Sequence, residues 1–439
     1  MMDHTQPRAT AGIAAPTLFM ATLLFYLVTL TPFIDLSATA TGDAATAKSN
    51  TLNQIVYLGL TAALWLTVLR SSARHLVARP RGILIVMLIW FAFVSAVSTQ
   101  PDLALKRVFL AMLTIVNGSI LLLLPRSERQ FAGILTLCCL GALALAYLGV
   151  ALMPRVAIHQ ASEIREPMNA GLWRGHFAHK NVAAAAMVVI SFVGLYLFGT
   201  GRRIVGSVMV VLAAAFLAKT GGKSAIAALP GILALAWAFE RWRALRIPMV
   251  LLGIAAFNIL TIGCAVSPTM RDLVAQLGID PTFTNRIDIW RIGATAVLDK
   301  PLTGHGFQLF WQTDAMVHKG GAAAGWAFAA FNGHNAYLDM AITTGIPGLV
   351  LTLVLLVWLP LRAIDRAEVT TNDPALTRLF VRIWLYGILA ACVESLFFQS
   401  GSLIWFMLVV ATFGLHLQAS AHEIREPARH PPSVEPAHA

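Results

Sequence analysis

Charged residues are scarce in this chain of 439 residues, since Asp, Glu, Lys and Arg make up 12% of it and hydrophobic residues 58%. The mean hydropathy is +0.73. These values exclude a water-soluble globular protein, because too few polar side chains are available to cover its surface. Cysteine is also scarce. The four cysteines, two of them the neighbours Cys138 and Cys139, predict neither a disulfide framework nor a zinc site.

Long hydrophobic runs recur from Ile13 to Leu417, and each can cross about 30 Å of hydrocarbon. They predict an all-α polytopic integral membrane protein with about twelve transmembrane helices. The expected spans are 13–34, 52–70, 83–98, 107–124, 132–153, 182–199, 204–218, 225–239, 247–266, 337–361, 379–397 and 402–418. We therefore expect one membrane domain over 1–418, a large outer loop at 267–335 before the tenth helix, and a disordered cytoplasmic tail at 419–439.

Arginine placement predicts the orientation, because loops on the cytoplasmic side are enriched in Lys and Arg. Alternate loops carry these residues: Arg70, Arg74, Arg79 and Arg81, then Arg126 and Arg129, Arg202 and Arg203, Arg241, Arg243 and Arg246, and Arg362 and Arg366. Both termini are therefore predicted to be cytoplasmic, in a multi-pass membrane protein. The same loops account for most of the net charge of +11, so no nucleic-acid partner is predicted.

A smaller set of basic residues falls on the predicted outer face, where the orientation rule does not explain it: Lys106, Arg107, Arg174, Lys180, Lys223, Arg286 and Arg291. Every even-numbered span begins on this face, so its free N–H groups and the positive end of its dipole point outward. Together these features favour binding of a diphosphate. Contact with lipid phosphates is the alternative for each residue taken alone.

Two of these cations lie at predicted helix starts. In the segment 171–181, Lys180 and Asn181 are expected to bind phosphate or sugar, and a plain helix cap is the alternative. Lys223 begins the next outer helix, where a snorkelling lysine is the alternative. His176 and His179 have a spacing seen in metal sites, but a third ligand at a matching spacing is missing, so we predict no metal site.

The large outer loop contains a predicted short helix, capped by Thr284 or Asn285, on which Arg286 and Trp290 share one face. The arginine is expected to clamp a diphosphate, while the tryptophan anchors the helix or stacks on a sugar. After this loop, His334 and Asn335 lie directly before a hydrophobic helix. A histidine there can accept a proton from a hydroxyl near neutral pH.

As a set, these residues resemble the superfamily of O-antigen ligases, O-antigen polymerases and exopolysaccharide polymerases, which are membrane glycosyltransferases of the C-type fold. The ligase signature H-N-x9-G-x-x-G is matched by His334, Asn335, Gly345 and Gly348. The element R-x-x-x-W followed by P-L-x-G-x-G is matched by Arg286, Trp290, Pro301, Leu302, Gly304 and Gly306. The element G-x-F-x-H-K-N of the exopolysaccharide branch is matched by Gly175, Phe177, His179, Lys180 and Asn181. Lys223 stands where the family's S-R-T-A element has arginine, so its match is weaker.

The resemblance implies an inverting, metal-independent transfer of a glycan from undecaprenyl diphosphate to an acceptor hydroxyl at the periplasmic face of the bacterial inner membrane, without a cofactor. It makes the outer loop 267–335 a periplasmic loop. His334 and Arg286 are the implied catalytic residues. The implied substrate-binding residues are Lys180, Lys223, His179, Asn181, Arg291, Trp290 and Asn335, and the implied structural glycines are Gly304, Gly306, Gly345 and Gly348. The implied partners are the lipid-linked oligosaccharide, an acceptor glycan (a lipid-linked repeat unit or lipid A core), membrane lipids, and export or chain-length machinery.

Two alternatives stay open. The exopolysaccharide-type segment 175–181 favours a polymerase of exopolysaccharide or O-antigen repeat units, and ligation of a finished glycan to lipid A core is the alternative within the superfamily. A transporter or flippase is the alternative from another class, since about twelve helices with both ends inside is also a transporter layout. Glu394 is the main ionisable residue in a predicted span. It would serve ion coupling in a transporter, or, with Asp339, orient a basic residue of the site.

Overall fold

The computed structural model describes residues 14–36, 43–163, 166–278, 280–283, 286–311, 313, 316, 327, 330–370 and 374–425. Within these ranges the chain forms helices and connecting turns, with one isolated antiparallel bridge between Ile158 and Trp173. The predicted all-α class is confirmed. The proposed caps Thr284 and Asn285 lie outside the described residues.

The helices before the large loop are α1 (Ala14–Val28), α2 (Asp43–Leu69), α3 (Arg81–Ala96), α4 (Pro101–Leu121), α5 (Glu128–Leu152), α6 (Pro154–Ala157), α7 (Lys180–Gly199), α8 (Arg203–Thr220), α9 (Lys223–Arg241) and α10 (Arg246–Val266). Local chemistry fixes several of their ends. Pro101 begins α4, where a missing N–H is not needed, and the Ser127 hydroxyl accepts a hydrogen bond from Gln130 N at the start of α5. Gly221 ends α8 in the left-handed conformation.

The later helices are α11 (Pro268–Gln276), α12 (Arg286–Asp299), α14 (Ala336–Leu353), α15 (Leu359–Thr370), α16 (Pro374–Ala390) and α17 (Leu403–Arg425). A π-helical turn, Val354–Trp358, joins α14 to α15. The large loop is therefore partly helical, and the predicted short helix beginning at Arg286 is present as α12. Residues 419–425 continue α17, which corrects the predicted start of the tail, and residues 426–439 lie outside the described ranges.

Each of the twelve predicted spans overlaps a helix. Within the described part of the chain, nine helical segments are long and apolar enough to cross a membrane, and α1 and α3 are shorter apolar helices. The protein is thus a multi-pass membrane protein. The eleventh span was drawn too long, because α16 ends at Ala390 and the chain then turns back through residues 391–402.

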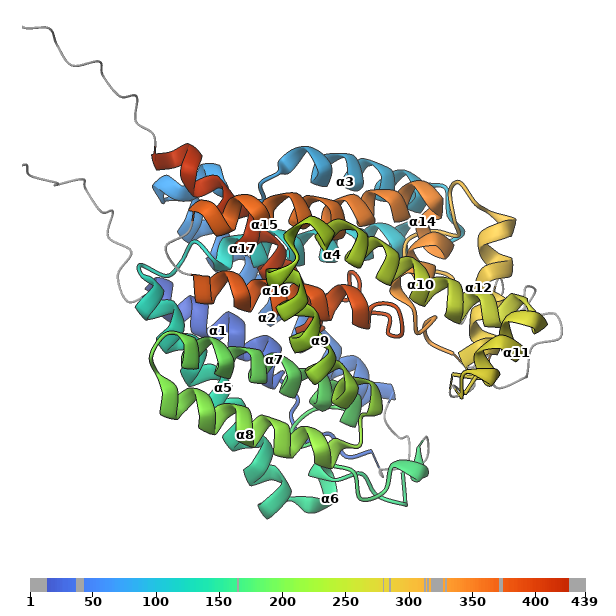
Figure 1. Ribbon diagram of the computed structural model, residues 1–439, viewed down its shortest axis with the longest axis horizontal. Helices are drawn as coiled ribbons and strands as arrows, with labels where there is room; N and C mark the ends of the chain where they lie inside the picture. The colour runs from blue at the N-terminus through green and yellow to red at the C-terminus, as the bar shows by residue number, and fades with distance from the viewer. Residues whose placement is uncertain are drawn as a thin grey trace, which may run out of the picture.

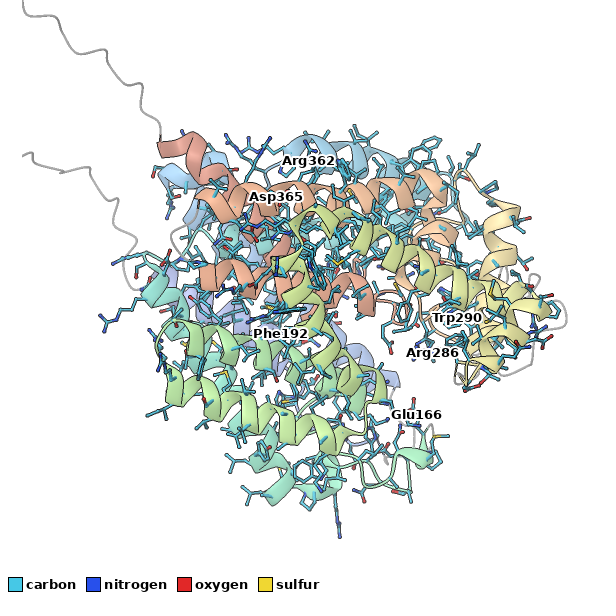
Figure 2. All side chains as sticks on the ribbon, in the orientation of Figure 1. Glu166, Phe192, Arg286, Trp290, Arg362 and Asp365 are labelled. Carbon is cyan, nitrogen blue, oxygen red and sulfur yellow. The ribbon has the colours of Figure 1, made fainter. Side chains whose placement is uncertain are left out.

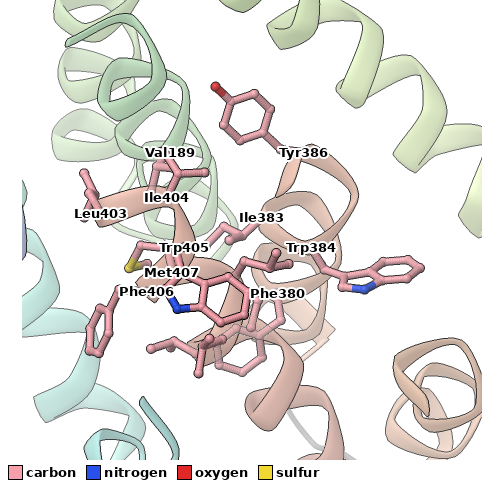
Figure 3. Close-up of a cluster of buried hydrophobic side chains, with 14 of the residues drawn as sticks. Val189, Phe380, Ile383, Trp384, Tyr386, Leu403, Ile404, Trp405, Phe406 and Met407 are labelled. Atoms are coloured by element: carbon pink, nitrogen blue, oxygen red, sulfur yellow. The ribbon is translucent and has the colours of Figure 1, made fainter. Parts of the chain in front are cut away.

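The centre of the bundle is built from α7, α16 and α17. In the 18-residue apolar stretch of each helix, 72% of the residues are buried in α7 and in α17, but 22% in α2 and in α9. The helices α2 and α9 therefore lie at the periphery. Figure 3 shows a cluster of buried hydrophobic side chains of α16 and α17, which includes Trp405, whereas Trp384 points away from it and packs against Phe239 of α9. Trp384 satisfies its indole N–H on the carbonyl of Leu356, 2.7 Å away. These packed helices form the rigid support on which the outer loops rest.

The two ends of the bundle differ in chemistry. α1 begins and α17 ends at one end of the molecule, and α11 and α12 lie at the other (Figure 1). Arg362 and Asp365 lie along α15, nearer the first end than Arg286, Trp290 and Glu166, which lie toward the second (Figure 2). Toward the first end, buried Arg246 pairs with Asp365 at 2.5 Å and with Glu368 at 2.6 Å, which ties α10 to α15. The second end carries the residues that the sequence singled out.

Candidate active site

Glu394 joins the two predicted catalytic residues. Its Oε1 accepts a hydrogen bond from Arg286 Nη2 at 3.1 Å, and its Oε2 lies 3.5 Å from His334 Nδ1. Arg286 Nη1 also donates to the carbonyl of Val393. All three charged side chains are partly exposed, at 22% for Arg286, 30% for Glu394 and 35% for His334. The carboxylate therefore orients both basic groups while each keeps a face open to a ligand.

Glu394 lies beyond the end of α16, in the turn that follows Ala390. It is not at the middle of a membrane span, where a transporter would use it for ion coupling. Of its two predicted roles, the orientation of basic residues is the one that the contacts support.

His334 has an unusual backbone. Its φ is +45°, in the left-handed region that few residues other than glycine adopt. The side chain of Asn332 accepts a hydrogen bond from His334 N at 3.1 Å, which holds this conformation. Such a conformation is strained, and it persists only where the surrounding structure stabilises it. Residues of this kind cluster at functional sites.

Asn335 fixes the start of α14. Its Oδ1 accepts a hydrogen bond from Leu338 N at 3.0 Å and its Nδ2 donates to Asn258 at 2.8 Å. The side chain is fully buried. Because both ends of its amide are occupied in the interior, its predicted contact with substrate is corrected here to a capping role, one residue away from His334.

Trp290 lies in the interior of the loop region. It is fully buried, and its indole N–H donates to the carbonyl of Gly333 at 2.9 Å. The predicted stacking on a sugar is therefore corrected, because no face of the ring is accessible. The alternative, an anchor for α12, fits these contacts, and it links the helix that carries Arg286 to the turn that carries His334.

Asp339, on the first turn of α14, binds both the turn that carries His334 and the turn that carries Glu394. Its Oδ1 accepts hydrogen bonds from Trp311 Nε1 at 2.7 Å and Gly333 N at 3.0 Å, and its Oδ2 accepts one from the Ser395 hydroxyl. Ser395 follows Glu394 directly. One carboxylate thus links the turn of His334 to the turn of Glu394. These hydrogen bonds fix the distance between the two turns.

Two of the motif glycines, Gly304 and Gly345, allow two segments of the chain to pack closely. The segment 301–306 packs against the middle of α14, where Ile346 N donates to Pro301 O and Gly306 N donates to Thr343 O. A Cβ atom on Gly304 would lie 2.6 Å from the carbonyl carbon of Thr343. Gly345 has φ +70° and ψ 177°, a conformation reserved for glycine, and it kinks α14. The two motifs are therefore parts of one structural unit.

A second polar cluster surrounds the start of α7. The ring of His179 accepts a hydrogen bond from Asn181 N at 3.1 Å, so His179 is the N-cap, and its Nε2 pairs with Glu166 at 2.9 Å. Buried His159 pairs with Glu163 at 2.7 Å and accepts a hydrogen bond from Lys180 N at 3.1 Å. The predicted helix start at Lys180 is present, and the residue that caps it is His179.

The charges of this cluster are tuned by its surroundings. Burial lowers the pKa of His159, although Glu163 opposes the shift. Burial acts to raise the pKa of Glu166, but its interactions with His179, Asn169 and His159 together outweigh burial, so the pKa is lowered. A neutral His159 is the form that accepts the hydrogen bond from Lys180 N, which keeps the first turn of α7 in place.

Lys180 and Lys223 begin neighbouring helices. Gly222, directly before Lys223, packs so closely on α7 that a Cβ there would lie 2.8 Å from the Cβ of Ala184. Lys223 is exposed, and its charge acts on that of Lys180. Two ammonium groups at two adjoining helix N-termini form a site of positive potential.

Arg174 does not belong to this group. It is buried, and its guanidinium donates to the carbonyls of Ile34, Phe177 and Ala178. The prediction that Arg174 faces an outer anion is wrong, because its N–H donors bind backbone carbonyls and hold the loop before α7 together.

The remaining predicted residues have clear partners. Arg291 donates to Asp288 at 2.9 Å and to the carbonyl of Ala265 at 3.2 Å, and it keeps 34% exposure. His176 lies 2.9 Å from the carbonyl of Leu27 through Nε2. In the ranges that the structure describes, no group of three His, Cys, Asp or Glu residues is arranged to hold a metal ion.

The sequence of the outer region matches proteins of known family. Residues 208–353 match the family of O-antigen ligases. This match covers α9 to α14 and includes Lys223, Arg286 and His334. The predicted resemblance to the O-antigen ligase and polymerase superfamily is thereby confirmed.

A curated relative supports the same relationship. The chain is 28% identical over 115 residues to an exopolysaccharide production protein, ExoQ, of Rhizobium meliloti. The matched region is 25% of this chain and 25% of the relative, so the chain spans about a quarter of the length of that protein.

Several residues that complete the site were not among those that the sequence motifs selected. These are Trp311 and Ser395, which contact Asp339 from other segments of the chain, and His159, which pairs locally with Glu163 and accepts a hydrogen bond from Lys180 N. Two other residues of the site, Glu394 and Asp339, belong to no motif, but their charge made them visible in the sequence. They are carboxylates close to hydrophobic segments, where an unpaired charge is costly.

Proposed function

We propose that this protein is a membrane enzyme of polysaccharide or O-antigen assembly. In this proposal it transfers a glycan from undecaprenyl diphosphate to an acceptor hydroxyl at the periplasmic face of the inner membrane, and it polymerises repeat units of exopolysaccharide or O-antigen type. The match of residues 208–353 to O-antigen ligases and the likeness to an exopolysaccharide production protein support this class.

The arrangement of Arg286, Glu394 and His334 carries the proposal. A transfer from a lipid diphosphate needs a cation for the departing phosphate and a base for the acceptor hydroxyl. Arg286 and His334 supply these two groups from two parts of the outer loop, the start of α12 and the turn before α14. Glu394 contacts both, so the cation and the base lie on opposite sides of one carboxylate.

The proposed reaction is a direct displacement at the anomeric carbon. The acceptor oxygen forms a bond to this carbon while the bond from the carbon to the diphosphate oxygen breaks, which inverts the configuration. His334 Nδ1 faces Glu394, so Nε2 takes the proton of the acceptor hydroxyl. The electron pair leaves on the diphosphate, whose charge Arg286 stabilises through a forked pair of donors.

Lys180 and Lys223 extend the positive site toward the lipid-linked donor. Their place at two helix N-termini suits an extended anion. His179 and Asn181 support Lys180 as parts of its helix cap, and Arg291 lies on the same helix as Arg286. The proposed mechanism uses no metal and no cofactor, because these cations perform the charge stabilisation.

Polymerase and ligase activity differ in the acceptor. The relative named for exopolysaccharide production favours a polymerase, whereas the description of the matched family favours ligation to lipid A core. Purified protein given lipid-linked repeat units alone is expected to produce a ladder of polymers. A single transfer that requires added core would instead identify a ligase. Export and chain-length machinery are further proposed partners.

The experiment for the reaction itself compares His334→Ala and Arg286→Ala with the wild type. Both variants are expected to insert and accumulate but to form no polymer or ligated product. Normal product from both variants refutes the proposed chemistry. Uptake or export of a solute, lost in Glu394→Gln without a change in glycan, would support the transporter alternative.

A further inference from the structure

A polar cavity of about 330 Å³ lies beside the turn that carries His334. Its wall includes Arg107, Trp311, Phe331, Asn332, Asp339 and Gln399. Asn332 and Ala336 line it from either side of His334 in the chain, and Ser395 lines it next to Glu394. No motif drew attention to this space, because its residues come from α4, the outer loop, α14 and the turn after α16.

The wall has the chemistry of a carbohydrate site. Aromatic rings offer flat apolar surfaces to the C–H face of a pyranose, and amides, a carboxylate and a guanidinium form hydrogen bonds with its hydroxyls. Phe331 lines the cavity and is 61% exposed. An acyl chain would instead require an apolar wall.

Two polar groups of the wall have capacity for a ligand. Asn332 uses its Oδ1 for His334 N, which leaves its amide N–H groups available. Arg107 donates to the carbonyl of Gln308, a neutral acceptor, with one of its five N–H groups. The volume lies at the lower end of the roughly 300–1,000 Å³ that small-molecule sites occupy. This size suits a single sugar ring.

The position of the cavity indicates which substrate it serves. Neither Arg286 nor His334 lines it, whereas Asn332 and Ala336, on either side of His334 in the chain, do. The group bound there would therefore lie beside the turn of the proton acceptor, and Arg107, which the sequence grouped with the diphosphate cations, would face the acceptor instead. Asn332 lines the cavity and also accepts a hydrogen bond from the backbone of His334. A ring bound by Asn332 would therefore have a fixed position relative to the base.

We propose that this cavity is the acceptor subsite, which binds the sugar ring whose hydroxyl is to be glycosylated. Phe331 stacks on the apolar face of the ring, and Gln399 and Asn332 bind its hydroxyls. This inference rests on the proposed glycan transfer, and it adds the residues that select the acceptor.

The test separates binding from transfer. The probe is the lipid-free oligosaccharide released by mild acid from the polysaccharide of the host, and purified full-length protein is studied in nanodiscs by saturation-transfer NMR. We expect the wild type to give saturation transfer that Phe331→Ala and Gln399→Ala weaken. Phe257→Ala removes a 47% exposed phenylalanine of α10 outside the cavity and is the matched control.

Transfer kinetics supply the second readout. With the lipid-linked donor saturating, Phe331→Ala is expected to raise the acceptor KM by about three- to tenfold, as loss of one stacking contact predicts, with little change in kcat. An unchanged acceptor KM in both cavity variants, or a raised donor KM instead, overturns the assignment. If the wild type binds the oligosaccharide in the NMR experiment but transfers no glycan, the subsite stands and the proposed enzyme activity is rejected. If the wild type transfers glycan but does not bind the oligosaccharide in the cavity, the enzyme activity stands and the subsite is rejected.

Discussion

The backbone carbonyl of Leu302 occupies the space where a Cβ atom on Gly345 would lie. Leu302 belongs to the segment after α12, and Gly345 lies at the kink of α14. This contact joins two motifs that are separated by more than forty positions in the printed sequence. The helix that bears Arg286 and the helix that follows His334 are therefore held together by close backbone packing, which a side chain would prevent.

The first prediction concerns this contact. Gly345→Ala should destabilise the protein by about 3 kcal/mol or more, because φ +70° with ψ 177° is strained for alanine and the carbonyl of Leu302 blocks its Cβ. A lowered Tm in detergent and reduced accumulation in the membrane would show it. Gly253→Ala in α10, where nothing lies within 4 Å, is the control and should leave the Tm unchanged or higher. Equal effects of the two changes would contradict this explanation.

Glu394 gives the second prediction. Glu394→Gln removes the charge that orients Arg286 and His334, so kcat should fall by about 10²-fold while the protein still accumulates. Glu394→Asp should restore part of the activity, since it keeps the carboxylate. Glu128→Gln, which changes an exposed glutamate at the start of α5, should behave as the wild type. Full activity of Glu394→Gln would exclude a positioning role.

The pH dependence of stability gives the third prediction. Burial lowers the pKa of His159 in the folded protein, so the unfolded chain binds more protons below its ordinary pKa of about 6.5. Stability should therefore fall as the pH drops from about 6.5 toward the folded pKa, and the Tm should fall with it. His159→Gln should flatten this slope, and buried His176, whose pKa is also lowered by burial, supplies the remainder.

Exposed His75 is the control for that measurement. His75→Gln changes a histidine at the opposite end of the bundle and should keep the wild-type slope of Tm against pH. If His159→Gln and His75→Gln have the same slope as the wild type, the coupling of His159 to the start of α7 is not what limits stability in acid.

The fourth prediction concerns Lys223. Lys223→Ala should raise the KM for the lipid-linked donor, by about three- to tenfold for the loss of one charged contact, because its ammonium belongs to the proposed diphosphate site. Lys223→Arg should keep the donor KM low, since it retains the charge and adds a fork of donors. Lys219→Ala, at an exposed lysine near the end of α8, should leave the KM unchanged. A KM that does not respond to Lys223→Ala would support the snorkelling alternative.

The sequence predicted the helices well because a membrane span needs a long apolar segment that is visible in the chain itself. It predicted α12 and the start of α7 because these begin at recognisable polar residues. It misjudged Trp290, Asn335 and Arg174, since amphipathic or polar side chains look the same in a sequence whether they face a substrate or satisfy buried backbone groups. Burial and partners distinguish these cases, and both depend on distant segments.

By itself, the sequence determined the all-α membrane class and the glycines of the two motifs, and it predicted His334 and Arg286 as catalytic candidates, because composition and local spacing encode these features. Only the tertiary structure decided that Glu394 lies between His334 and Arg286, that Gly345 receives the carbonyl of Leu302, and that Arg107 and Phe331 share a cavity. The physical reason is that each of these relationships joins segments far apart in the chain, and packing of the helices sets the distance between them.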